Sequence, residues 1–522
     1  MLFSSFVFIF AFLPLSLAVT YGAGRFRRFG WIARLALTVL SLGFYAWWRP
    51  IQLPILVGSI LFNYVVGDLI QKALAAERRR IATTWLVVGL AFDLGLLGWF
   101  KYANFVSDNL ALLTGGTSDL PKIALPLAIS FFTFQKIAYL VDSYRGEARK
   151  MSLLDFSLFA SFFPQLLAGP IVHYKEVVPQ LRSRLFGRLI WRNVMVGLVI
   201  FAIGLFKKTV IADTLAAHAN PLFDSVGQGA HLDAGQAWLA ALSFTLQVYF
   251  DFSGYSDMAI GAGRMLGVKL PLNFHSPLRA ASIIDYWRRW HMTLQRFIVS
   301  YLFQPMALAF NRAAAERGLR GWSAFALGVG IPTFITFVAV GIWHGAGWTF
   351  VVFGVMHSIY LCTNEVWREQ RRQLRRKLRK AGRELGEPGV WERAGYHTVT
   401  LLAVIYANVM FRTHTVGDAL SVWAGMTGLR GGTLEPILSM PGDLAVAMIA
   451  GGLLVFLAPN TQQIMSRFSP AYNWGEWRDV GHAPLRWRWS PNTAGLLFAG
   501  AILIAGILMI QRGQAIFLYF NF

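Results

Sequence analysis

Long apolar stretches recur along the whole chain of 522 residues, and they constrain its fold more than any other feature. A helix needs about 20 consecutive apolar residues to cross a membrane. The stretches that meet this requirement are 3–22, 31–48, 51–71, 82–100, 123–141, 189–206, 235–252, 321–343, 345–366, 395–411, 442–458 and 493–511. We therefore predict an all-α polytopic membrane protein with about 11–13 membrane segments.

One further apolar stretch, 153–172, contains Pro164, Gly169 and Pro170. Proline and glycine interrupt a helix, so this stretch predicts a broken or re-entrant helix. A membrane tolerates such a helix only where it is packed inside protein.

The composition excludes several other classes of protein. Hydrophobic residues make up 56% and charged residues 14% of the chain, whereas soluble domains carry about 25% charged residues. The formal charge is +22, but in a membrane protein such an excess marks cytoplasmic loops. Because no recognition module accompanies the charge, we expect no nucleic-acid partner. The single cysteine, Cys362, cannot form an intramolecular disulfide, and we expect no metal site.

The order of charges at the N-terminus predicts the orientation of the chain. No basic residue precedes the first apolar stretch, and Arg25, Arg27 and Arg28 follow it. A cleaved signal peptide has the reverse order, so we expect a retained first span. Since basic loops lie inside, the N-terminus is predicted to lie outside the cell membrane.

The densest basic segment is 368–380, in which eight of thirteen residues are Lys or Arg. It could attract anionic lipid headgroups or an anionic cytoplasmic donor through Arg371, Arg372, Arg375 and Arg376. The alternative, which we favour, is a solvated helix that only fixes the topology.

Polar residues interrupt the apolar pattern at 249–261. This segment contains Asp251, Ser253, Tyr255 and Asp257, and Gly254 permits a break in the helix. An ionisable residue at membrane depth is a functional candidate by default. The segment either lines a buried polar cavity or is a helix end that meets water at the interface.

Three histidines lie in apolar or interfacial sequence. His344 follows Trp343 between two long apolar stretches and is flanked by small residues. A histidine in such surroundings stays neutral at pH 7, as a general base requires. His357 fits either a functional role or a helix-packing hydrogen bond. His291 ends a segment that begins at Asp285 and interleaves Trp and Arg, which is typical of an amphipathic interfacial helix.

At these residues the chain resembles the membrane-bound O-acyltransferase (MBOAT) family, in particular the bacterial branch that includes the alginate O-acetylation membrane protein. The most specific matching blocks are 249–261, 287–291 and 343–345, and weaker ones lie at 46–49, 100–105, 125–134, 142–146, 163–170 and 206–213. The chain departs from alginate-type members at 298–305, which lacks an Arg–Asp pair and a Gly–Gly stretch. It also has Gln135 where a glutamate is common.

The resemblance implies a single MBOAT-type membrane domain with a cytoplasmic funnel and a narrow tunnel to the outer face. Within it we expect N-terminal spans at 1–122, a catalytic core at 123–366, a basic cytoplasmic loop at 367–394 and C-terminal spans at 395–522. The family's catalytic histidine falls on His344, and its second histidine falls on His291.

The resemblance also implies an inner-membrane O-acyltransferase, of an acetyltransferase type. We expect no bound cofactor, with acetyl-CoA as the donor substrate. The acceptor is expected to be a hydroxyl of an exported polysaccharide or of a periplasmic relay partner, such as an SGNH-type acetyltransferase. D-alanyl or another short acyl group is the alternative cargo.

A different class of function uses the same polar residues. A transporter or flippase for the polysaccharide or its carrier would use Asp251, Asp257 and Asp285 as proton or cation sites. It predicts internal repeats, and the sequence contains no obvious repeat. A third possibility, a structural membrane scaffold, would not explain the histidines in apolar sequence.

Overall fold

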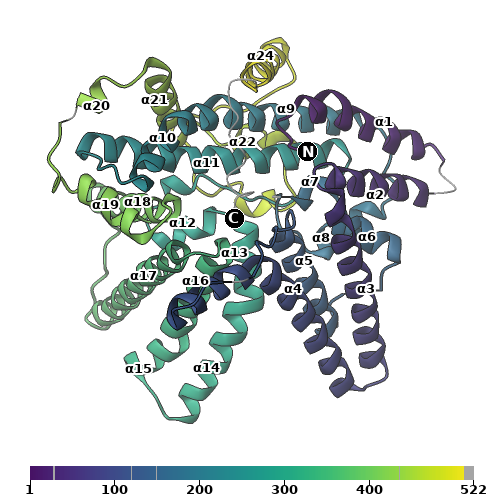
Figure 1. Cartoon of the computed structure of the whole chain (residues 1–522), viewed down its shortest axis with the longest axis horizontal. Helices are drawn as coiled ribbons and strands as arrows, with labels where there is room; N and C mark the ends of the chain where they lie inside the picture. Colours follow the sequence, from purple (N-terminus) through teal and green to yellow (C-terminus); the bar gives the residue numbers. More distant parts are fainter. Residues whose placement is uncertain (27–29, 119, 149, 168, 434, 511–522) are drawn as a thin grey trace. The chain divides into compact units, whose positions relative to one another are not determined.

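The computed structural model of the chain describes residues 1–26, 30–118, 120–148, 150–167, 169–433 and 435–510. Arg27, Arg28 and the last residue of the predicted span 493–511 lie outside these ranges. Regular structure in the described ranges is entirely helical, without a strand, which confirms the predicted all-α class (Figure 1).

One compact unit consists of Met1–Asp213, Phe250–Asn273 and the described residues from Pro459 onward. Within it α3 packs against α4 and α5, and α24 packs along α9. The helices of this unit are η1 (Phe8–Phe12), α1 (Leu13–Ala23), α2 (Trp31–Ala46), η3 (Pro50–Gln52), α3 (Leu53–Ala75), α4 (Arg79–Thr114), α5 (Ile129–Tyr144), α6 (Leu153–Ser161), α7 (Phe163–Leu166), α8 (Tyr174–Leu181), α9 (Trp191–Phe206), η4 (Lys207–Ala212), α22 (Thr461–Ile464), η8 (Ser466–Phe468), α23 (Trp474–Trp477) and α24 (Thr493–Met509).

The second unit consists mainly of Thr214–Tyr249 and Phe274–Ala458. Within it α16 and α17 lie side by side, and α17 also packs against α12 and α18 (Figure 1). Its helices are η5 (Pro277–Arg279), α12 (Ile283–Arg289), α13 (Met292–Ile298), η6 (Val299–Phe303), α14 (Gln304–Glu316), α15 (Gly321–Phe325), η7 (Ala326–Gly330), α16 (Ile331–His344), α17 (Trp348–Lys380), α18 (Val390–Arg412), α19 (Val416–Met426), α20 (Glu435–Leu438) and α21 (Gly442–Phe456). Helix α10 (Asp213–Gly227) starts at the boundary between the units, and α11 (Ala234–Met265) contributes its first half to the second unit.

Within the described residues, five helical segments are long and apolar enough to cross a membrane: Pro50–Ala75, Arg79–Thr114, Trp191–Gly227, Gly321–His344 and Val390–Arg412. Four shorter apolar helices, Phe8–Ala23, Trp31–Ala46, Gly442–Phe456 and Thr493–Met509, match further predicted spans. Length and composition therefore support a multi-pass membrane protein.

The remaining predicted spans, 123–141, 235–252 and 345–366, fall in α5, α11 and α17. Helix α5 has only 16 residues, and α11 and α17 continue into segments that carry several charged side chains. The count of about 11–13 membrane segments and the sequential division at 122, 366 and 394 stay predictions.

The stretch 153–172 is broken as its prolines predict. Helix α6 ends at Ser161, Phe162 leaves the helical conformation with ψ of 107°, and Pro164 is the second residue of the short helix α7. Proline is tolerated there because the first turn of a helix has no use for its missing N–H group. Apart from residue 168, nearly every residue from Phe156 to Val172 is buried, as a membrane requires of a broken helix.

The helix break that Gly254 permits does not occur, because α11 runs without interruption from Ala234 to Met265. Its second half crosses α9 instead. A Cβ atom added at Gly254 would lie 2.7 Å from the carbonyl oxygen of Gly204, and one at Gly261 would lie 2.6 Å from that of Gly197. Two glycines seven residues apart on each helix thus let the backbones touch, as small residues do in membrane helix pairs.

Candidate functional site

The predicted site residues fall into two sets, one in each unit. The second unit contains His291, His344 and His357, whereas the first contains Asp251 and Asp257. Each set is built by contacts within its own unit.

His344 is the last residue of α16, and its side chain is buried, with 4% of its surface exposed. The helix ends there because Gly345 adopts an extended conformation before α17 starts at Trp348. A Cβ atom at Gly345 would lie 2.1 Å from the ring of Phe350, so only glycine fits under this ring. The small residues beside His344 therefore admit α17 in close packing.

Aromatic rings surround the imidazole of His344. Its ring centroid lies 4.9 Å from that of Trp343, 5.2 Å from Phe411 and 5.7 Å from Phe353. These rings pack edge to face with the imidazole. A proton transfer at His344 would therefore take place in a buried aromatic environment.

His357 lies on α17 and is linked to α12 by a hydrogen bond. The indole Nε1 of Trp287 donates to Nδ1 of His357 over 3.1 Å. Because an indole only donates, Nδ1 accepts and the proton of the neutral ring is on Nε2. The ring of Phe353 lies 4.5 Å from that of His357 and 5.7 Å from that of His344, so Phe353 contacts both histidines. The helix-packing interpretation of His357 agrees with this geometry.

His291 occupies the junction between α12 and α13 and is fully buried, with 1% of its surface exposed. Its φ of 43° is in the left-handed region, which costs a residue other than glycine about 1–2 kcal/mol. Burial lowers the pKa of His291 to about 3, so the imidazole is neutral at pH 7. Its ring lies 6.3 Å from that of Trp343, next to His344. Burial of this kind does not fit a histidine in the headgroup region.

We call the rings of Trp287, His291, Trp343, His344, Phe353 and His357 the histidine–aromatic cluster. The cluster joins two of the predicted motifs, 287–291 and 343–345. Asp285 is placed differently: it forms an ion pair with Arg289 over 2.9 Å and is partly exposed. The expected supporting role of Asp285 in the cluster stays a prediction.

In the first unit, Asp251 is ion-paired with a buried lysine. The Nζ atom of Lys208 lies 2.7 Å from Oδ1 of Asp251 and 2.6 Å from Oδ1 of Asp213. Lys208 belongs to the π-helix η4, in which the N–H group of Asp213 donates to the carbonyl of Lys208. The π-helical turn places residues five apart on one face, which explains why Lys208 and Asp213 meet.

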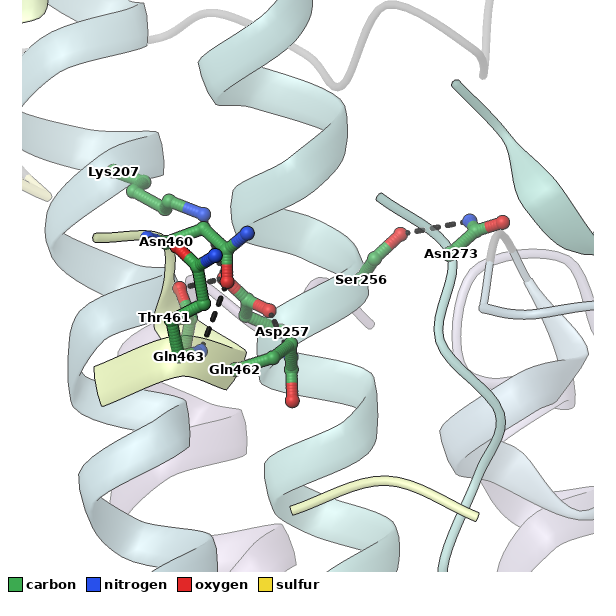
Figure 2. A network of polar contacts seen from close by, with 8 residues as sticks. All are labelled: Lys207, Ser256, Asp257, Asn273, Asn460, Thr461, Gln462 and Gln463. Carbon is green, nitrogen blue, oxygen red and sulfur yellow. Dashed lines mark hydrogen bonds and ion pairs between the residues drawn. The ribbon is translucent and has the colours of Figure 1, made fainter. Parts of the chain in front are cut away.

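Asp257 is held by a second set of partners (Figure 2). Its Oδ2 atom lies 2.7 Å from Nζ of Lys207 and accepts a hydrogen bond of 2.6 Å from Thr461. Its Oδ1 atom accepts one of 3.0 Å from Gln462. Both carboxylates of the segment 249–261 are thus neutralised by consecutive lysines.

The turn that carries Thr461 and Gln462 is fixed by a capping box. The side chain of Asn460 accepts from the backbone N–H of Gln463, and the side chain of Gln463 accepts from that of Asn460 (Figure 2). This reciprocal pair satisfies two N–H groups at the start of α22. The capping box therefore holds Thr461 and Gln462 in the turn from which they contact Asp257 on α11.

The other polar residues of 249–261 are also buried. Ser253 and Tyr255 are 2% and 1% exposed, and the ring of Tyr255 stacks on Phe3 at 4.8 Å. Ser256 accepts a hydrogen bond of 3.0 Å from Asn273 (Figure 2). The segment is an interior polar layer, and the interpretation as a helix end in water is wrong.

The basic segment of α17 is partly neutralised by nearby acids. Arg372 pairs with Glu369 on the same helix at 2.7 Å, and Arg371 pairs with Glu392 on α18 at 3.3 Å. Arg375 and Arg376 are exposed and have no acidic partner among the described residues. Together with the exposed Lys377, Arg379 and Lys380, they keep this segment positively charged.

Sequence reasoning missed Lys207, Lys208 and the amide and hydroxyl partners from the C-terminal segment. The lysines directly follow the apolar stretch 189–206, so two charges at a predicted helix end were a usable signal. Thr461 and Gln462 gave no such signal. Among the described residues, no group of His, Cys, Asp or Glu is placed to hold a metal ion.

Comparison with known proteins adds independent information. A model of the membrane-bound O-acyltransferase family matches residues 81–391. The chain is 39% identical over 459 residues to the peptidoglycan O-acetyltransferase of Helicobacter pylori, covering 83% of this chain and 81% of that protein. It is 36% identical over 456 residues to the "Probable alginate O-acetylase AlgI" of Pseudomonas aeruginosa, covering 83% and 79%. The teichoic acid D-alanyltransferase of Streptococcus thermophilus is 23% identical over 291 residues, covering 54% and 68%.

Proposed function

Because the chain belongs to the membrane-bound O-acyltransferase family and is an O-acyltransferase, we propose that it transfers acetyl groups to hydroxyls of an exported cell-envelope polysaccharide. The names of two relatives support acetyl as the cargo, since both denote O-acetylation, and these relatives are 39% and 36% identical to this chain over the aligned residues. The D-alanyl alternative has weaker support, because that relative is 23% identical.

His344 is the proposed general base. It would take the proton of the acceptor hydroxyl while the hydroxyl oxygen attacks the carbonyl carbon of the thioester. The C–S bond then breaks, and the proton passes to the leaving thiolate. The burial of His344 among Trp343, Phe353 and Phe411 is the observation that carries this assignment, because it would shield the proton transfer from bulk water.

His291 and His357 have supporting roles in this proposal. Both contact rings that also contact His344, namely Trp343 and Phe353. The left-handed conformation of His291 is the kind of backbone strain that clusters at active sites. They would hold the aromatic rings in place around His344.

Acetyl-CoA is the proposed donor, presented from the cytoplasmic side, where the exposed Arg375 and Arg376 would attract its phosphates. The proposed acceptor is either a sugar hydroxyl or a hydroxyl of a periplasmic relay protein of the SGNH type. The proposal places the protein in the bacterial inner membrane, with its N-terminus in the periplasm and a tunnel joining the two sides.

In this structure, basic side chains neutralise the carboxylates that a transporter would use. Asp251 and Asp257 are each paired with a lysine, and Asp285 is paired with Arg289. A proton or cation site needs a carboxylate that can change its charge, and a close ammonium opposes that change. This pairing supports a structural role for the interior carboxylates.

Mass spectrometry of the exported polysaccharide tests the proposal in cells. Cells that express the wild-type chain should export acetylated polymer, and cells with His344→Gln should export the same amount of polymer without acetyl groups. His231→Gln is the matched control, because His231 is exposed on the surface of the same unit. A loss of polymer together with its acetyl groups would point to transport instead.

A further inference from the structure

The C-terminal segment between α22 and α24 forms a second candidate site, far in sequence from the histidine–aromatic cluster. Residues between Pro459 and Arg488 line a cavity of about 660 Å³. Ligand sites typically have volumes of about 300–1,000 Å³. We call this cavity the arginine basin, because Arg467, Arg478, Arg486 and Arg488 line it.

The charge of the arginine basin is strongly positive. Its four arginines face one acid, Asp479, which lies 3.4 Å from Arg478. Arg467, Arg486 and Arg488 have no acidic partner among the described residues, and all three are exposed. Like charges gathered around one cavity repel each other, and an anion in the cavity would relieve that repulsion.

Two tryptophans and a serine also line the basin. Trp474 is buried, whereas Trp487 is exposed. The hydroxyl oxygen of Ser466 is buried and has no hydrogen-bond partner among the described residues. A buried hydroxyl without a partner is unfavourable, and a bound acceptor would satisfy it.

The basin lies beside the start of the apolar helix α24. The ring of Trp487 lies 4.8 Å from that of Phe498 on α24, and Trp489 donates a hydrogen bond of 2.9 Å to the carbonyl oxygen of Gly495. Helix α24 is one of the apolar helices that match a predicted membrane span. Tryptophan and arginine at the end of such a helix are typical of the headgroup level of a bilayer.

We propose that the arginine basin binds a phosphate group of an anionic ligand at the membrane surface. Arginine suits this chemistry because its planar guanidinium donates two parallel hydrogen bonds to phosphate oxygens. Two sources can supply the phosphate: the headgroup of an anionic phospholipid, or a soluble molecule with linked phosphates. The proposal does not depend on the proposed acetyl transfer, because it is tested by binding.

The test uses the purified full chain, inorganic pyrophosphate as the soluble probe, and nanodiscs of phosphatidylglycerol or phosphatidylcholine. Calorimetry measures pyrophosphate binding, and native mass spectrometry measures the retained lipid. The basin variant is R467Q/R486Q/R488Q. The matched control, R78Q/R80Q/R188Q, removes the same charge from exposed arginines of the same unit outside the basin.

We expect the basin variant to bind the preferred probe about tenfold or more weakly, since each lost charge-assisted hydrogen bond contributes about tenfold. The control should bind like the wild type. Preferential retention of phosphatidylglycerol identifies the lipid source, and pyrophosphate binding without lipid preference identifies the soluble source. If the basin variant does not fold, R467K/R486K/R488K replaces it and should show a smaller loss.

Three results would overturn the proposal. One is that neither probe binds the wild type. Another is equal binding by the wild type and the basin variant, or an equal loss in the control. The third is tighter binding of a polyuronate oligosaccharide than of both phosphate probes, because the basin would then recognise carboxylates of a polymer.

Discussion

Replacement of Lys208 by methionine tests whether the interior carboxylates are structural. The side chains of Lys208 and Asp251 are each 3% exposed, and that of Asp213 is 7% exposed. Methionine keeps most of the volume of lysine but removes its charge. The two carboxylates, 2.7 Å and 2.6 Å from the ammonium, then lose a shared partner in the interior. Removing one partner of a buried ion pair costs about 3–5 kcal/mol.

The free energy of unfolding in mixed micelles, measured by denaturant titration, gives the magnitude directly. Lys72→Met is the matched control: Lys72 pairs with Asp68 at 2.6 Å, but its side chain is 66% exposed. We expect no measurable loss there, because water solvates both partners. The triple variant K208M/D213N/D251N should recover part of the stability, since no charge stays unpaired. Equal effects of K208M and K72M would refute the account of this network.

Three further predictions concern the cluster and the basic helix. Trp287→Phe removes the hydrogen-bond donor to His357 and should lower the free energy of unfolding by about 1–3 kcal/mol, measured in the same titration. An unchanged free energy of unfolding would mean that water replaces the indole. Arg375→Gln with Arg376→Gln should raise the KM for acetyl-CoA several-fold and leave kcat unchanged in a turnover assay. An unchanged KM would mean that the basic segment only fixes the topology. Burial holds the pKa of His291 near 3, below the ordinary value of 6.5, so below pH 6.5 the unfolded chain takes up a proton that the folded chain does not. The free energy of unfolding should therefore fall by about 1.4 kcal/mol per unit as the pH drops from 6.5 towards 3, and His291→Gln should show a flatter profile.

The sequence predicts those parts of the fold that depend on local pattern. Apolar stretches locate the helices, and Pro164 predicts the break within 153–172. The sequence also identifies the three histidines, which in the structure contact shared aromatic rings. Each of these features depends on a few residues that are neighbours in the sequence.

Features that arise from contacts between distant segments could not be predicted in this way. Asp257 meets Thr461 from 204 positions away, and Trp287 meets His357 from 70 positions away. Gly254 suggests a break from its local flexibility, yet packing against Gly204 keeps α11 helical. Tertiary packing stabilises a buried helix more than its intrinsic propensity does, and glycine there serves close approach.

The most direct test of the central claim is the turnover of labelled acetyl-CoA by the purified protein with its acceptor. The account predicts that His344→Gln lowers kcat about 10²–10⁴-fold, as loss of a general base does, while the protein stays folded. The control His231→Gln should turn over like the wild type. Normal turnover by folded His344→Gln would contradict the account.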